Sequence, residues 1–78
     1  MQVAPNPNSG SFTLNFNKIP GNLSVQLIDR LGKVVYNKSD LNYLLTNYPV
    51  YTSGLSAGIY LLKVNANSEV FVRKVMIQ

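Results

Sequence analysis

The carboxylates are the first residues to consider as catalytic or metal-binding groups, and the chain has only three: Asp29, Asp40 and Glu69. Acid–base catalysis by paired carboxylates needs two of them in one cleft, and calcium needs several convergent oxygens. These three lie far apart in the sequence, each in or beside an expected turn. The chain lacks Cys and His, which excludes thiolate zinc sites and histidine-based catalysis. A Ser–Lys pair stays open, but no G-x-S-x-G motif supports one. We therefore expect no catalytic residue, metal site or cofactor, and interpret the protein as a non-enzyme.

The basic residues are the second candidate group, since seven Lys and Arg give a formal net charge of +4. Cations and aromatic rings on a β platform can bind single-stranded nucleic acid. Here the cations are scattered singly or in one pair, and Phe12 and Phe16 share a strand face with Leu14, which favours core packing. We predict no nucleic-acid partner. A small nucleic-acid-binding barrel stays as an alternative, which a salt-dependent shift of a labelled oligonucleotide would reveal.

The size of the chain limits the scaffold that positions these residues. A chain of 78 residues buries about 60% of its surface on folding, enough for one small core. Charged residues make up 13%, well below the usual quarter, and this weakly charged, polar composition favours a β-rich protein outside the cytoplasm. The apolar runs are far too short for a transmembrane segment. No leader peptide opens the chain, so we expect one domain, residues 1–78, excised from a larger secreted protein and preceded by a starter Met1.

Alternating apolar and polar residues predict β-strands in the first half of the chain. Residues 11–16 alternate strictly, and residues 23–29 do so with Leu23, Val25 and Leu27 facing inward. A tight turn at 29–32 connects the second of these to a partner strand at 33–38. Residues 39–47 read as a loop, and residues 48–52 as a short strand that Pro49 confines to an edge or an irregular position.

The second half of the chain predicts two further strands and completes the fold class. Residues 59–64 are apolar on both faces until Lys63, as expected of a central strand, and residues 69–78 form the last strand. Six strands are expected, with room for a seventh, and no helical period appears. The pattern predicts an all-β fold: a small antiparallel β-sandwich with immunoglobulin-like connectivity. A five-stranded barrel is the alternative.

Four short motifs follow one another along this framework. They are Pro5-Asn6-Pro7 with Gly10, Asp29-x-x-Gly32-x-x-Val35, Leu55-x-x-Gly58-x-Tyr60, and the closing Arg73-Lys74-Val75. Each alone is explained by local structure: a turn, a hairpin, a turn into a central strand, and a final strand. In the third motif we expect the glycine to serve the backbone, through a positive φ that another residue would adopt at a cost of around 1 kcal/mol.

In this order and spacing, the motifs resemble the C-terminal sorting domain (type A) of the type IX, or Por, secretion system of Bacteroidetes. The resemblance runs from about residue 4 to residue 78. Residues 41–49 depart from it, because they are richer in Leu and Tyr than the polar linker expected there. This departure leaves the strand boundaries around 41–52 open.

The resemblance implies a non-catalytic secretion signal. Members of the family follow an upstream cargo in cis, pass through the periplasm, and are recognised as folded domains by an outer-membrane translocon. A sortase-like peptidase then commonly removes the domain, and the cargo is secreted or anchored at the cell surface. The alternative is a stand-alone immunoglobulin-like adhesion or spacer module that needs no translocon.

The last strand is our candidate for the recognised surface. An exposed strand edge allows a partner to add a strand, with neighbouring side chains supplying specificity. Arg73 and Lys74 are adjacent cations in an otherwise apolar strand, so they point to opposite faces and are candidate electrostatic contacts. They are equally well explained as solvated charges. An unpaired edge could also associate with the same edge of a second copy.

Overall fold

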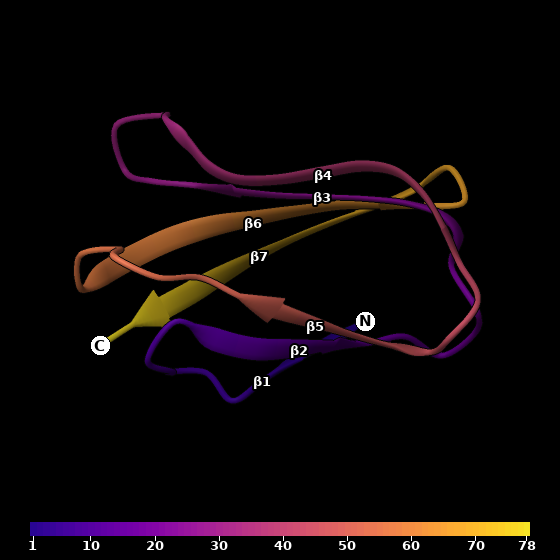
Figure 1. The fold of residues 1–78 in the computed structure, drawn as a ribbon, viewed down its shortest axis with the longest axis horizontal. Helices are drawn as coiled ribbons and strands as arrows, with labels where there is room; N and C mark the ends of the chain where they lie inside the picture. The colour runs from indigo at the N-terminus through magenta and orange to yellow at the C-terminus, as the bar shows by residue number, and fades with distance from the viewer.

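Two stacked antiparallel sheets make up the fold in the computed structural model, which covers residues 1–78 (Figure 1). The smaller sheet has the order β1-β2-β5 and the larger one the order β4-β3-β6-β7. The strands are β1 (Gln2–Ala4), β2 (Ser11–Asn15), β3 (Gly21–Ile28), β4 (Val34–Tyr43), β5 (Asn47–Tyr51), β6 (Gly58–Ala66) and β7 (Glu69–Ile77). There is no helix and no closed barrel, so the predicted sandwich is confirmed and the barrel alternative is not.

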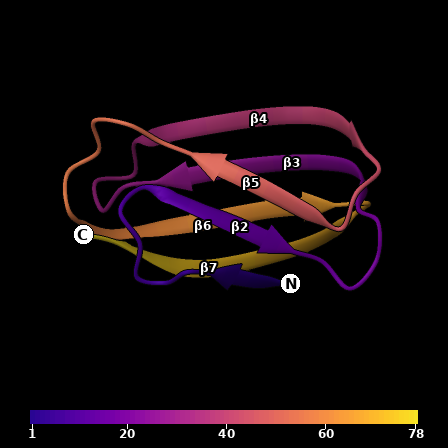
Figure 2. The same ribbon diagram turned by 60° about the horizontal axis from the view of Figure 1, so that its bottom comes forward.

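The connections between the sheets follow the immunoglobulin-like pattern. The second and fifth strands pair in one sheet while the third and sixth pair in the other, so β2 lies in the opposite layer from β3, and β5 in the opposite layer from β6. The seventh strand completes the four-stranded sheet beside β6. The chain therefore crosses between the layers at β2–β3, β4–β5 and β5–β6 (Figure 2).

The core lies between the layers and is built by the alternation seen in the sequence. In β3 the inward residues Leu23, Val25 and Leu27 are fully buried, as predicted. From the opposite sheet, Phe12 and Leu14 of β2 are buried against them. Burying a side chain of this kind contributes about 1.5–3 kcal/mol, so a core of 13 buried residues stabilises a chain without disulfides.

The third-to-fourth strand connection was predicted as a hairpin, and its fourth strand is longer than predicted. Residues 39–43, expected to be loop, continue β4, and residues 41–43 of this stretch pair with Gly21 to Leu23 of β3. The continuation is possible because the register shifts between Leu23 and Val25, where Asp40 takes a φ of 55° and its N–H donates to Ser24 Oγ. The loop prediction failed because Asp and Asn mark a bulge as well as a turn.

The expected edge position of Pro49 is confirmed, since β5 pairs only with β2. The strand beyond the six expected is β1, which pairs with β2 through Val3 opposite Leu14. Three residues are too few for alternation to indicate a strand.

Candidate functional site

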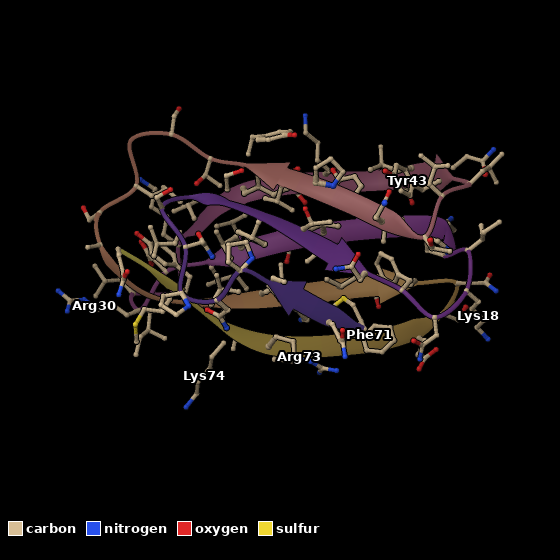
Figure 3. All side chains as sticks on the ribbon, turned by 90° about the horizontal axis from the view of Figure 1, so that it is seen from below. Lys18, Arg30, Tyr43, Phe71, Arg73 and Lys74 are labelled. Atoms are coloured by element: carbon tan, nitrogen blue, oxygen red, sulfur yellow. The ribbon has the colours of Figure 1, made fainter.

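The first three sequence motifs and the last residues of β7, the strand that carries the fourth motif, meet at one end of the sandwich, which we call the motif end. Pairing sets this arrangement: Gly58, at the start of β6, lies opposite Ile77, at the end of β7, and Asn8 bridges to the same Ile77. The β3–β4 turn and the β5–β6 loop reach the same end, at the left of Figure 1 beside the C-terminus. The opposite end holds the β2–β3, β4–β5 and β6–β7 connections (Figure 1). Figure 3 accordingly places Arg30 and Lys18 at opposite ends of the molecule.

The Pro-Asn-Pro motif covers part of the β7 edge. The side-chain amide of Asn6 donates to Lys74 O at 3.0 Å and accepts from Met76 N at 2.9 Å. Two further bonds follow, from Asn8 N to Met76 O at 3.0 Å and from Gln78 N to Asn8 O at 2.7 Å. Neither proline has a backbone N–H, so the carboxamide of Asn6 supplies the donor that a paired strand would otherwise supply.

The turn after the prolines is fixed by Asn8 and Gly10. Asn8 is buried, and its side chain accepts from Gly10 N at 2.8 Å and donates to Pro5 O at 3.1 Å. Gly10 has a φ of 108°, and its carbonyl accepts both the amide and the hydroxyl of Thr52. These contacts join the entering chain to the residue that follows β5, which closes the motif end.

The second motif forms the β3–β4 turn. Asp29 Oδ1 accepts from Leu31 N and Lys33 N, both at 2.9 Å. Gly32 follows with a φ of 84°, the left-handed conformation that Gly adopts without strain. Val35, the last residue of the motif, is partly buried against the core. Asp29 thus has a turn-forming role and is not part of a carboxylate pair.

The third motif forms a tyrosine corner at the start of β6. Tyr60 is buried, and its hydroxyl donates to Ser56 O, four residues upstream, at 2.5 Å. Leu55 packs against the core from the same loop, and Gly58 has a nearly extended φ of 159°. A groove of about 630 Å³ lies between this loop and the β3–β4 turn, lined by residues that include Asp29, Arg30, Leu31 and Ile59.

The two cations of β7 lie on opposite sides of the sheet, as predicted. Arg73 is on the inner side at the edge, where its guanidinium lies 5.6 Å from the Phe71 ring centroid and donates to Val72 O and Met1 O. Lys74 is exposed and points away from the sandwich (Figure 3). Val75, between them and the C-terminus, is fully buried. Arg73 therefore has local partners in the fold, whereas Lys74 is presented to solvent.

The motif residues thus build the turns of the motif end. One exposed surface, the outer face of β6, was not predicted from the sequence. β6 was expected to be a central strand because it is apolar on both faces, and this position is confirmed. β6 is central within its sheet, but only its inward side is covered, because a two-layer sandwich has no third layer. Ile59 and Leu61 are exposed to solvent, at 55% and 40%. The sequence did contain a signal for this surface, because a chain of 78 residues is too short to cover both faces of an apolar strand.

Neither a metal site nor a membrane helix is present in the structure. No group of three or more carboxylates comes together that could hold a metal ion. No helix has the length and apolar character needed to cross a bilayer.

The fold places the protein among the small immunoglobulin-like β-sandwiches. The chain matches the family model described as the secretion system C-terminal sorting domain over residues 2–78. The chain belongs to this family, whose members are C-terminal secretion signals of the type IX system. A sorting signal of this kind is non-catalytic and is recognised by the secretion machinery, which directs export to the cell surface or beyond. A comparison with curated proteins finds no match.

Proposed function

We propose that this domain is the folded secretion signal of a larger secreted protein and takes no part in catalysis itself. In this proposal the cargo precedes residue 1 in cis, and the outer-membrane translocon binds the folded domain after passage through the periplasm. A sortase-like peptidase then separates the domain from the cargo, which is released or anchored at the surface.

The observation that supports the proposal is the direction in which the chain enters the sandwich. β1 runs toward the motif end, so a preceding cargo would lie toward the other end and leave the motif end accessible (Figures 1 and 2). The C-terminus and the first three motifs would then face the translocon together. We propose that the motif residues act chiefly by holding this end in shape, since most of them are buried or bound in turns.

The edge of β7 is the proposed site of strand addition. Lys74 O, Met76 N and Met76 O point away from β6, since they bond the Asn6–Asn8 segment. Backbone groups alternate direction along an antiparallel strand, so Val70 and Val72 also turn theirs away from β6. Val72 O already accepts from the Arg73 guanidinium, so the backbone groups of Val70 and the N–H of Val72 form a short open section of edge, which can receive a partner strand, including one from a second copy.

The test is a fusion of a signal-peptide-bearing reporter to the N-terminus of the domain. We expect the reporter outside cells with an intact type IX system and in the periplasm of cells without its translocon. An adhesion or spacer module would give the same distribution in both strains, which would refute the proposal. Replacing Arg73 and Lys74 with Ser should lower export while the domain stays folded, and undiminished export would remove these two residues from the recognised surface.

A further inference from the structure

The outward positions of β6 and β7 break the pattern expected of a solvated sheet. Antiparallel sheets with one face in water normally place polar residues outside. The smaller sheet follows this rule, with Ser11, Thr13 and Asn15 on the outward positions of β2. The larger sheet does not. Its outward positions on β6 and β7 expose five large apolar side chains, which we call the outer apolar patch: Ile59, Leu61, Val70, Val72 and Met76.

Ile59, Leu61 and Met76 form the centre of the outer apolar patch, and Val72 and Val70 extend it along β7. Ile59 lies directly opposite Met76 across the β6–β7 pair, and Leu61 lies opposite Ile28 of β3 on its other side. Directly paired residues share a face of the sheet, with Cβ atoms about 4.5–5.5 Å apart. Ile28 in turn pairs with the exposed Val34 of β4. Contiguous apolar patches of this kind mark interaction sites, whereas single exposed apolar residues do not.

Two lysines are set into the patch. Lys74 lies directly opposite Leu61, and Lys63 lies directly opposite Val72. Both are exposed. The outward positions of β6 and β7 hold no carboxylate, because Glu69 begins β7 opposite the inward-facing Ala66. Beyond Lys63 the same face becomes polar, around a hollow lined by residues that include Ser24, Gln26 and Asn65.

From this placement we infer that the outer apolar patch, with Lys63 and Lys74, binds an apolar protein surface that carries carboxylates. The inference rests on the proposed function and names the chemistry of the surface that the secretion machinery presents. Carboxylates opposite the two lysines would neutralise charges that the domain leaves unpaired, and this complementarity sets orientation as well as partner choice.

The charge and composition of the outer apolar patch favour an acidic protein partner over a second copy of the domain and over a lipid surface. Two copies stacked through this face would bring Lys63 and Lys74 of each copy into one apolar interface with no outward carboxylate on β6 or β7, which like-charge repulsion disfavours. A lipid surface is favoured by interfacial aromatic residues and clustered cations. The patch has no aromatic residue and only two lysines.

Charge reversal in the reporter fusion tests the inference. We expect K63E/K74E to lower the exported fraction by about tenfold or more, since each new carboxylate would face another one. The matched control is K18E/K38E, which makes the same change of charge at exposed positions outside the patch and should retain wild-type export. A second variant, Leu61→Ser with Met76→Ser, should lower export while the domain stays folded by circular dichroism, because both side chains lie outside the buried core.

The outcomes separate the inference from the proposed function. If the unaltered fusion is not exported through the type IX system, the proposed function fails and the inference falls with it. If the unaltered fusion and K63E/K74E are exported equally, the inference alone is overturned. Co-sedimentation of the domain with phosphatidylglycerol vesicles at physiological salt, lost in K63E/K74E, would assign the patch to lipid and overturn the inference. Sedimentation of the wild-type domain as a dimer that Leu61→Ser dissolves would also overturn it.

Discussion

At the residue scale, the Pro-Asn-Pro motif is explained by the hydrogen bonds of one carboxamide. Asn6 offers a donor and an acceptor to successive groups of the β7 edge, between two residues that have no N–H to offer. Asp would keep the acceptor and lose the donor, and Ser is too short to span both groups. The sequence alone indicated a turn at this position, but the pairing with β7 depends on contacts 68 and 70 residues away.

We therefore expect Asn6→Ala to loosen the β7 edge without unfolding the domain. The loss of two side-chain bonds at an exposed edge should cost about 1 kcal/mol. The measurement is amide hydrogen exchange, in which Met76 N–H should lose protection while the amides of β3 keep theirs. Asn42→Ala, an exposed site on β4, is the control. Unchanged protection at Met76 would show that the carboxamide does not hold the edge.

A second residue-scale prediction concerns two glycines of the motifs. Gly10 combines a φ of 108° with a close approach, because a Cβ there would lie 2.9 Å from Thr52 Oγ1. Gly58 is nearly extended, and a Cβ there would meet nothing within 4 Å. Gly10→Ala should therefore destabilise the domain by about 1–3 kcal/mol, and Gly58→Ala by less. Thermal melts decide, and an equal loss at both positions would contradict the structural distinction.

At the element scale, the strands with strict alternation were predictable and the irregular ones were not. Leu23, Val25 and Leu27 faced inward as expected, since a period of two leaves only one face for the core. The bulge at Asp40 was hidden, because one extra residue breaks the alternation that indicates a strand. The exposed face of β6 was hidden for another reason. An apolar pattern shows which residues avoid water, but it does not show whether the cover is part of the same chain.

The junction of β4 and β5 gives an element-scale prediction on pH. The hydroxyls of Tyr36 and Tyr48 share a hydrogen bond of 2.9 Å between the two sheets. Burial raises the pKa of Tyr36 well above its ordinary value of about 10, and the hydrogen bond and charge of Tyr48 add to the effect. The folded state thus holds a proton that the unfolded chain releases above pH 10. Stability from this pair is full below pH 10 and falls as the pH rises beyond it.

Urea unfolding between pH 8 and pH 11 measures this loss. Tyr36→Phe should be less stable than wild type at pH 8, because it breaks the hydroxyl pair, and should lose less stability between pH 10 and pH 11. Tyr51→Phe, at an exposed tyrosine of β5, should show the wild-type decline. Parallel curves for wild type and Tyr36→Phe would show that the pair does not control the alkaline limit.

At the scale of the whole molecule, the two ends of the sandwich differ, because the motifs and the C-terminus lie toward one of them. The motifs are spread over the chain, yet antiparallel pairing returns the first three, and the end of the strand that carries the fourth, to one end. Their order was visible in the sequence, but their convergence was not, because the β3–β4 turn and the β5–β6 loop meet only after both sheets have formed. The outer apolar patch begins at the same end with Ile59, so the two candidate surfaces are continuous.

This difference between the two ends predicts that the two termini tolerate fusion differently. Gln78 is held in the motif end by its bond to Asn8, so a folded domain fused directly after it would cover that end. The same domain fused before residue 1 would join the chain where β1 starts, directed away from the motif end. We expect export of a reporter to survive the N-terminal fusion and to fall at least about tenfold with the C-terminal one, since a blocked surface removes the docking contacts. The measurement is the extracellular fraction of the reporter, with circular dichroism to show that the sandwich stays folded in both proteins. Equal export of the two fusions would mean that the translocon does not contact the motif end, and recognition would then have to lie elsewhere on the sandwich.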